Sequence, residues 1–307
     1  MLTSRRSRLS AAVATLGALT LGAFNPATAD WRKEYPSLTL GVITTENEAD
    51  RVTRYKPVIA YFKNKLGVDI KWRTATDYAG IIEGVKAGKI EIARLGPASY
   101  AQAYIVTKGQ VQPLVGEISN DGTFGYFAVV VVKKDSPFQS IQDLKGKRFA
   151  FADPNSTSGH QAPRYFLGEA GIDADEFFGK TAFSGSHENS VMALMNGTFD
   201  GVATWWRNDE RSNMTRMEGK GMIPKGQWRI VYKTPRLPSS PWAMSTKLPT
   251  EMRDDVQKVL LDMPTADPVA WKALTDGKAL RYQKVTHDDY KPIVRMIQSN
   301  LEKRRGS

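Results

Sequence analysis

Short apolar runs alternate with longer segments of helical periodicity along most of this chain. The run at 38–43 has the length and composition of a buried strand, and apolar positions at helical spacing follow over 53–66, ending at Gly67. A continuous apolar run at 128–132 indicates another buried strand. This alternation is typical of strand–helix–strand units with parallel strands, so the pattern predicts an α/β fold.

Two helix–strand units of the chain are weakly similar to each other. Asp77 and Ser186 are each placed to cap a helix, and Tyr78 and His187 follow them as the first helical residues. We interpret the similarity as two lobes of similar construction, each presenting a helix N-terminus at a corresponding place. Ligands of open α/β sheets bind beyond the carboxyl ends of the strands, where such N-termini lie.

The most informative polar stretch lies between a strand predicted at 148–152 and the helix after it. Ser156, Thr157 and Ser158 place three hydroxyl groups in a row at the start of that helix. Three O–H donors, free backbone N–H groups and the helix dipole together suit an anion with several acceptor oxygens. An ordinary N-cap, which needs one hydroxyl, is the alternative. From this cluster we expect Thr157→Val to weaken binding at least about tenfold with little effect on stability.

Composition and charge narrow the possible chemistry. The 307 residues include no cysteine, which excludes disulfides, thiolate zinc sites and a cysteine nucleophile. Only three histidines occur, so we expect no metal site and no cofactor. The formal net charge of +11 favours encounters with anionic ligands. No basic block interleaved with aromatic residues indicates nucleic acid as a partner.

Residues 1–29 have the pattern of a signal peptide. Arginines near the start precede an apolar run at 9–24, and small residues at 27–29 supply a cleavage pattern. We therefore expect the chain to be exported.

Sequence motifs of enzymes are missing. No Gly-x-Ser-x-Gly elbow and no His-Glu-x-x-His motif occurs. Gly179-Lys180-Thr181 is not a phosphate loop, because Ala174 stands where its first glycine is required. We predict no catalytic residue. Ser158 and His187 could still form a triad with a carboxylate, which leaves a secreted hydrolase as the less favoured alternative.

At its polar loops the chain resembles the phosphonate-binding periplasmic proteins of ABC transporters, within the larger phosphate/phosphite/phosphonate-binding family. The matching stretches, in family order, are 77–82, 122–129, 153–159, 186–189 and 232–238. The resemblance implies an α/β fold of the type II periplasmic-binding-protein kind, with two lobes, central mixed sheets and two crossover strands. Lobe 1 is expected at 30–132 plus 236–307, and lobe 2 at 133–235.

The resemblance also implies a site, a partner and a location. It implies that the phosphonate oxygens are held by Tyr78, Ser156, Thr157, Ser158 and His187. Further candidates for ligand contact are Ser99, Tyr126, Trp205, Trp206 and Asp209. The implied protein is a monomer of the periplasm that delivers its small oxyanion ligand to an ABC permease in the inner membrane.

The chain departs from the family where the substituent on phosphorus is recognised. In 2-aminoethylphosphonate binders carboxylates meet the ammonium, whereas the nearest positions here are Arg207 and Ser240. Of the adjacent Trp205 and Trp206, one is expected to face the cleft and the other the core. A tryptophan with Asp209 could still bind an ammonium. The ligand therefore stays open between 2-aminoethylphosphonate and methylphosphonate, phosphite, phosphate or another small oxyanion.

Overall fold

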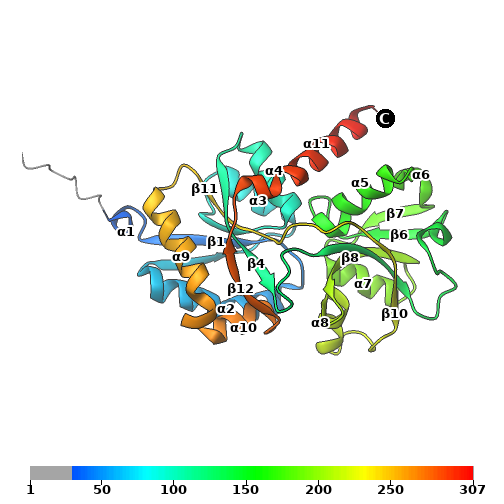
Figure 1. The fold of residues 1–307 in the computed structure, drawn as a ribbon, viewed down its shortest axis with the longest axis horizontal. Helices are drawn as coiled ribbons and strands as arrows, with labels where there is room; N and C mark the ends of the chain where they lie inside the picture. The colour runs from blue at the N-terminus through cyan, green and yellow to red at the C-terminus, as the bar shows by residue number, and fades with distance from the viewer. Residues whose placement is uncertain (1–29, 307) are drawn as a thin grey trace, which may run out of the picture. The chain divides into compact units, whose positions relative to one another are not determined.

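The computed structural model describes residues 30–306. They form two mixed β-sheets with helices packed against them, the α/β architecture that the alternating pattern predicts. Figure 1 shows both sheets and the segments that pass between them. The expected signal peptide, residues 1–29, lies outside the described residues. Every helix of the described part is too short or too polar to cross a membrane.

The first sheet has the strand order β12-β4-β11-β3-β1-β2. Strand β1 pairs in parallel with β2 and β3, whereas β11 and β12 run antiparallel to their neighbours. The strands are β1 (Ser37–Val42), β2 (Asp69–Arg73), β3 (Ile92–Arg94), β4 (Val111–Ser119), β11 (Trp242–Ser245) and β12 (Ala279–Lys284).

The second sheet has the order β10-β5-β8-β6-β7, with β9 paired to β8. Strand β6 pairs in parallel with β7 and β8, and β5 runs antiparallel to β8 and β10. The valine run of β5 is fully buried, as expected for a strand covered on both faces. The strands are β5 (Phe127–Lys133), β6 (Arg148–Phe151), β7 (Lys180–Phe183), β8 (Gly201–Asn208), β9 (Arg211–Ser212) and β10 (Trp228–Lys233).

The two sheets repeat one arrangement. In each, three parallel strands (β2-β1-β3 and β7-β6-β8) are followed by an antiparallel strand, β11 or β5. Helices α3 (Tyr78–Lys86) and α7 (His187–Met195) precede equivalent strands and are capped by the side chains of Asp77 and Ser186. The weak sequence repeat therefore corresponds to a structural repeat.

The chain changes sheets twice, over 120–126 and over 234–241. These two segments pair through backbone hydrogen bonds between Tyr126 and Leu237, with N···O distances of 3.0 and 2.8 Å. Strand β5 lies in the second sheet, so the boundary expected after residue 132 cuts off that strand from its own sheet. We propose two lobes that meet at the two segments, with 127–133 in lobe 2.

Helices cover the sheets, and the C-terminal one contacts both groups of elements. Ile293 and Ile297 of α11 pack in one buried cluster with Ala101 of α4 and Ala162 of α5. Figure 1 shows α11 running from α4 toward α5. The remaining helices are α1 (Trp31–Glu34), α2 (Glu48–Leu66), α4 (Pro97–Val106), α5 (Ala162–Glu169), α6 (Ala174–Phe177), α8 (Asn213–Gly219), α9 (Thr250–Ala266), α10 (Pro268–Thr275), α11 (Lys291–Gly306) and the short turns η1 (Ile141–Leu144), η2 (Thr157–Gln161) and η3 (His287–Tyr290).

Candidate functional site

A cavity of about 120 Å³ lies between residues carried by the two sheets. Most of the residues predicted for ligand contact line it, although they come from five separate parts of the chain. They are Tyr78, Tyr126, Ser156, Thr157, Ser158, His187 and Trp205. All of these except Trp205 are buried. Their contact with a ligand stays a prediction, but the fold brings them to one place.

The hydroxyl cluster sits where β6 ends and the helical turn η2 begins. Ser156 is the N-cap of η2, and its Oγ accepts a hydrogen bond from the backbone N–H of Gly159 at 3.0 Å. Thr157 Oγ1 accepts from the backbone N–H of Ala98, at the start of α4, at 2.8 Å. The cluster is therefore fixed both to its own turn and to a helix that follows the first sheet's β3.

Ser99 helps to hold this loop and does not line the cavity. Its Oγ donates to the backbone carbonyl of Asn155 at 3.0 Å. Gly96 passes close to the same loop, because a Cβ atom at that position would lie 3.0 Å from Thr157 Oγ1. The structure thus places Ser99 behind the hydroxyl cluster, as a support for the loop backbone.

His187 is a neutral, fully engaged imidazole. Its Nε2 lies 3.1 Å from Ser156 Oγ and its Nδ1 lies 3.1 Å from Thr204 Oγ1. Burial, together with the smaller effect of the positive charge of Arg216, lowers the pKa of His187 to about 3. In the tautomer that carries its proton on Nε2, the imidazole donates to Ser156 Oγ. The Ser156 hydroxyl proton is then left for an anion in the cavity.

Two buried phenols complete the set of neutral donors. The Tyr78 hydroxyl is buried without a hydrogen-bond partner among the described residues. Burial raises the pKa of Tyr78, and the nearby Asp153 carboxylate raises it further. Burial also raises the pKa of Tyr126 to about 12, although the hydroxyls of Thr157 and Ser158 act against that shift. Both phenols therefore keep their protons and can donate to an anion.

The cavity also contains four arginines, of which the sequence analysis singled out only Arg207. Three of them surround the Glu117 carboxylate, which is completely buried. The Nη2 atoms of Arg94 and Arg207 lie 3.6 and 3.5 Å from it, and Arg211 hydrogen-bonds to it directly. Burial alone would raise the pKa of Glu117, but the guanidinium charges of Arg211, Arg207 and Arg94 hold it at about 2.

The fourth cavity arginine, Arg216, stacks on the indole of Trp205, with its guanidinium carbon 4.9 Å from the ring centroid. Trp205 lines the cavity, whereas the next residue, Trp206, packs on Phe127 of the neighbouring strand β5. Trp205 thus faces the cavity and Trp206 the opposite side of the sheet, as strand alternation requires. Asp209 is exposed beyond β8, so the structure does not bring it to the cavity.

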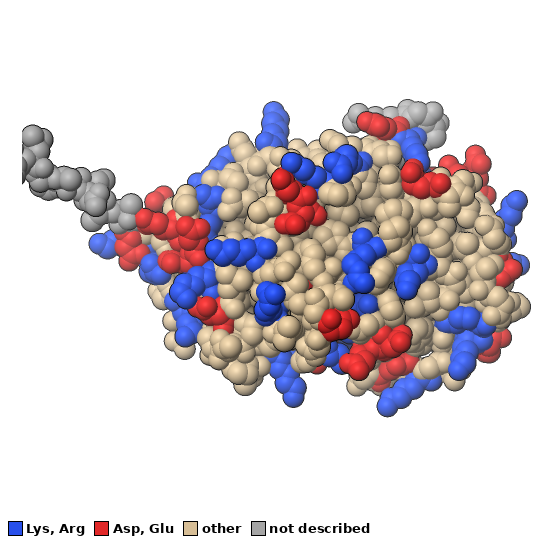
Figure 2. Space-filling model, viewed as in Figure 1, with Lys and Arg blue, Asp and Glu red and all other residues tan. Residues whose placement is uncertain are grey.

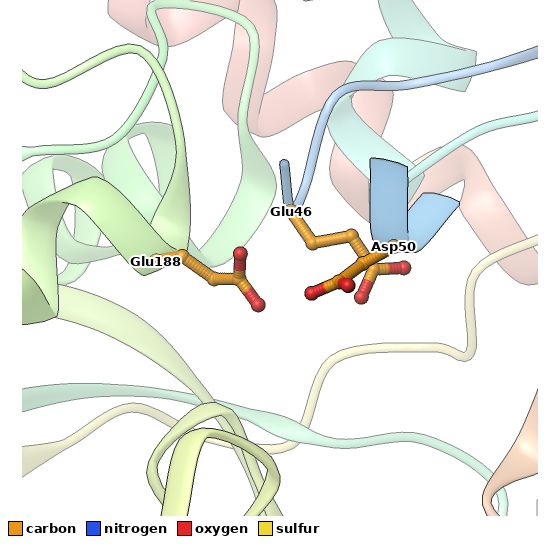
Figure 3. Close-up of side chains that lie close together, drawn as sticks. All are labelled: Glu46, Asp50 and Glu188. Carbon is orange, nitrogen blue, oxygen red and sulfur yellow. The ribbon is translucent and has the colours of Figure 1, made fainter. Parts of the chain in front are cut away.

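Three carboxylates that could hold a cation are instead occupied by a lysine. Glu46, Asp50 and Glu188 offer oxygens within 4.8 Å of one another. Figure 3 shows Glu188 directed toward the other two. The ammonium of Lys220 lies 2.6 Å from Glu188, 2.7 Å from Asp50 and 3.0 Å from Glu46. This ion-pair network links α2 with α7 and α8.

Comparison with known proteins connects this architecture with one family. The model of the family described as "ABC transporter, phosphonate, periplasmic substrate-binding protein" matches residues 40–290. The chain is 31% identical to the phosphonates-binding periplasmic protein of Escherichia coli over 225 residues, which are 72% of this chain and 64% of that protein. The alignment therefore spans slightly less than two thirds of that relative's length.

A second relative and a solved structure cover more of their own length. The chain is 28% identical over 280 residues to the phosphate-import protein PhnD of Mycolicibacterium smegmatis, which covers 89% of this chain and 86% of that protein. The crystal structure of a binding protein component of an ABC phosphonate transporter from Pseudomonas aeruginosa has a TM-score of 0.74 at 26% identity, with 85% of each chain covered.

Proposed function

We propose that this chain, which belongs to the family of periplasmic substrate-binding proteins of phosphonate ABC transporters, binds a small phosphonate or related oxyanion in the cavity around Ser156, Thr157 and Ser158. Proteins of this family bind substrates for transport and are not enzymes. The observation that carries the proposal is the convergence of three hydroxyls, two protonated phenols and one neutral imidazole on a single cavity.

The donors match the acceptors of a phosphonate group in number and in strength. A phosphonate presents three oxygens, and the consecutive hydroxyls with the phenols of Tyr78 and Tyr126 offer enough O–H donors for them. Each hydrogen bond to a charged oxygen contributes roughly 1.5–3 kcal/mol. Three or four therefore reach the roughly 8 kcal/mol of a micromolar complex before the costs of association are subtracted. Because the site is buried, water competes little for these donors.

The size of the cavity limits the ligand to a short substituent. Pockets for drug-sized ligands measure about 300–1,000 Å³, whereas this cavity measures about 120 Å³. A phosphonate with one or two carbons fits this size class. Family membership implies the periplasm. We propose that the chain reaches it through a signal peptide at 1–29, acts as a monomer, and passes its ligand to an ABC permease in the inner membrane.

The identity of the ligand is best tested by calorimetry with a panel of small oxyanions. The panel contains 2-aminoethylphosphonate, methylphosphonate, phosphite and phosphate; phosphate belongs in it because one relative is named for phosphate import. The protein is first unfolded and refolded to remove any bound ligand. We expect binding at micromolar concentration or below to at least one member, and much weaker binding in Ser158→Ala. Binding to none of the four, nor to any other short phosphonate, would refute the proposal.

A further inference from the structure

The cavity holds more positive charge than hydroxyl recognition of a phosphonate requires. Four arginines line it, and none of the lining residues is acidic. We call Arg94, Arg207, Arg211 and Arg216 the arginine cluster. Two carboxylates pair with the cluster, Glu117 with the first three and Asp276 with Arg216.

The charges around Glu117 do not balance. Three guanidinium groups share this one carboxylate, which leaves an excess of two positive charges around Glu117 among the described residues. Asp276 also attracts Arg211, but it already pairs with Arg54 and Arg216. The side chains of Arg207 and Arg211 are only 8% and 6% exposed, so water cannot compensate them fully. Burial lowers the pKa of Arg207 to about 10, and repulsion from Arg211 and Arg94 acts in the same direction against the attraction of Glu117. Buried charges that lack a partner are costly, so an anion is expected here.

The single sign of charge in the cavity differs from the mixed charges on one face of the surface. On the face seen in Figure 2, Lys and Arg side chains are interspersed with Asp and Glu. Charges of both signs therefore mix on this surface, whereas the side chains that line the cavity carry a single sign.

Individual donors of the cluster also lack acceptors. The Nε atoms of Arg94 and Arg211 are buried without a hydrogen-bond partner among the described residues. Arg94 donates to the hydroxyl of Tyr55 at 3.3 Å, and its distance of 3.6 Å from Glu117 is too long for a good hydrogen bond. Buried N–H groups in native proteins are nearly always paired. The Nε atoms of Arg94 and Arg211 are therefore available to an acceptor that enters the cavity with the ligand, although Arg229 and Arg253, outside the cavity, have unpaired Nε atoms too.

An ammonium group is a poor candidate for this part of the cavity. The indole face of Trp205, which could otherwise attract a cation, is already covered by the guanidinium of Arg216. No carboxylate lines the cavity to pair with an ammonium, and the nearby charges would repel it. A negatively charged substituent would instead be attracted by these arginines. A carboxylate suits them best, because guanidinium groups bind carboxylates through paired, charge-assisted hydrogen bonds.

We propose, building on the function proposed above, that the ligand carries a carboxylate in addition to its phosphonate, and that the arginine cluster binds this carboxylate. The phosphonate lies at the hydroxyls of residues 156–158. Arg207 connects the two ends, because its guanidinium carbon lies 5.8 Å from the ring centroid of Tyr126. The cavity of about 120 Å³ leaves room for a linker of only one or two carbons, which makes phosphonoacetate the simplest representative of the substrate class.

The test compares short phosphonates whose substituents are negatively charged, neutral or positively charged. Phosphonoacetate, ethylphosphonate and 2-aminoethylphosphonate are titrated into the ligand-free full-length mature protein by calorimetry, with malonate as the control that lacks phosphorus. We expect phosphonoacetate to bind at least about tenfold more tightly than ethylphosphonate, and 2-aminoethylphosphonate to bind more weakly than both. Equal affinities, the reverse order, or malonate binding as tightly as phosphonoacetate would overturn the inference.

The same titrations separate this inference from the proposed function. If ethylphosphonate binds at micromolar concentration and phosphonoacetate binds no better, the phosphonate site stands and the carboxylate site is refuted. If no ligand with phosphorus binds, including the four oxyanions of the first panel, the proposed function itself is refuted. Since the comparison uses the native chain, it does not depend on whether any variant folds.

A pair of arginine variants then tests the assignment to the cluster. Arg94→Gln removes one positive charge beside Glu117, and we expect the affinity ratio of phosphonoacetate to ethylphosphonate to fall at least about fivefold. Arg54→Gln is the matched control: the side chain of Arg54 is 11% exposed and pairs with Glu46 and Asp276, but it does not line the cavity. An unchanged ratio in a folded Arg94→Gln, or an equal fall in both variants, would contradict the assignment.

Discussion

Replacing Thr157 by valine should damage both binding and folding, because its hydroxyl has two roles in the structure. Valine keeps the shape of threonine but leaves the buried N–H of Ala98 without the acceptor that lies 2.8 Å away. An unpaired buried N–H costs about 1–3 kcal/mol. Losing one hydrogen bond to a charged phosphonate oxygen costs about 1.5–3 kcal/mol of binding, which is about 10- to 100-fold in affinity. The expectation from sequence, that stability barely changes, is therefore revised.

Ser158→Ala is the matched variant, because no backbone group of the described residues depends on the Ser158 hydroxyl. Calorimetry with the tightest ligand and urea unfolding of the ligand-free protein measure the two effects separately. We expect both variants to bind about 10- to 100-fold more weakly, only Thr157→Val to lose about 1–3 kcal/mol of stability, and Thr157→Ser to recover most of both. Wild-type affinity in Thr157→Val, or equal destabilisation in the two variants, would refute the reasoning.

Two further predictions concern charge. The pKa of His187 is about 3 in the folded protein and about 6.5 in the unfolded chain. The unfolded chain therefore takes up a proton that the folded one refuses, and the free energy of unfolding should fall by about 2 kcal/mol between pH 7 and pH 5; urea titrations in which His187→Asn shows the same fall would contradict this. Lys220→Met leaves Asp50 and Glu188 without their cationic partner, while Glu46 keeps Arg54, and should destabilise the protein by about 1–3 kcal/mol. Adding Glu188→Gln should partly reverse this loss in thermal unfolding; unchanged stability of the single variant would contradict this.

Local signals explain which parts of the fold were predictable from sequence. Helices α3 and α7 have polar caps at Asp77 and Ser186, and α2 ends at Gly67, which takes the left-handed conformation with φ 70°. Helix α4 gave no such signal, because it is buried on most sides and lacks an amphipathic stripe. The apolar run of β5 indicated a buried strand, but nothing in it indicates which of two sheets the strand joins. The difference between the lobe boundary expected from sequence and the one we propose follows from that ambiguity.

The candidate site also has one part that was predictable from sequence and one that was not. The three hydroxyls were recognisable because they are consecutive and stand at a helix start. The arginine cluster was not, because its members come from β3, β8, β9 and α8 and are brought together only by the pairing of distant strands. Glu117, the carboxylate that organises three of them, lies in a strand that the sequence pattern did not single out. The charge that distinguishes this cavity is therefore visible only in the folded chain.

A crystal structure of the protein with its tightest phosphonate ligand tests the central claim most directly. Our account predicts that the phosphonate oxygens lie within about 3.2 Å of the side-chain oxygens of Ser156, Thr157 and Ser158, inside the cavity that His187 and Tyr78 also line. A phosphonate bound elsewhere on the protein, or bound in the cavity with its oxygens turned away from these hydroxyls, would contradict it.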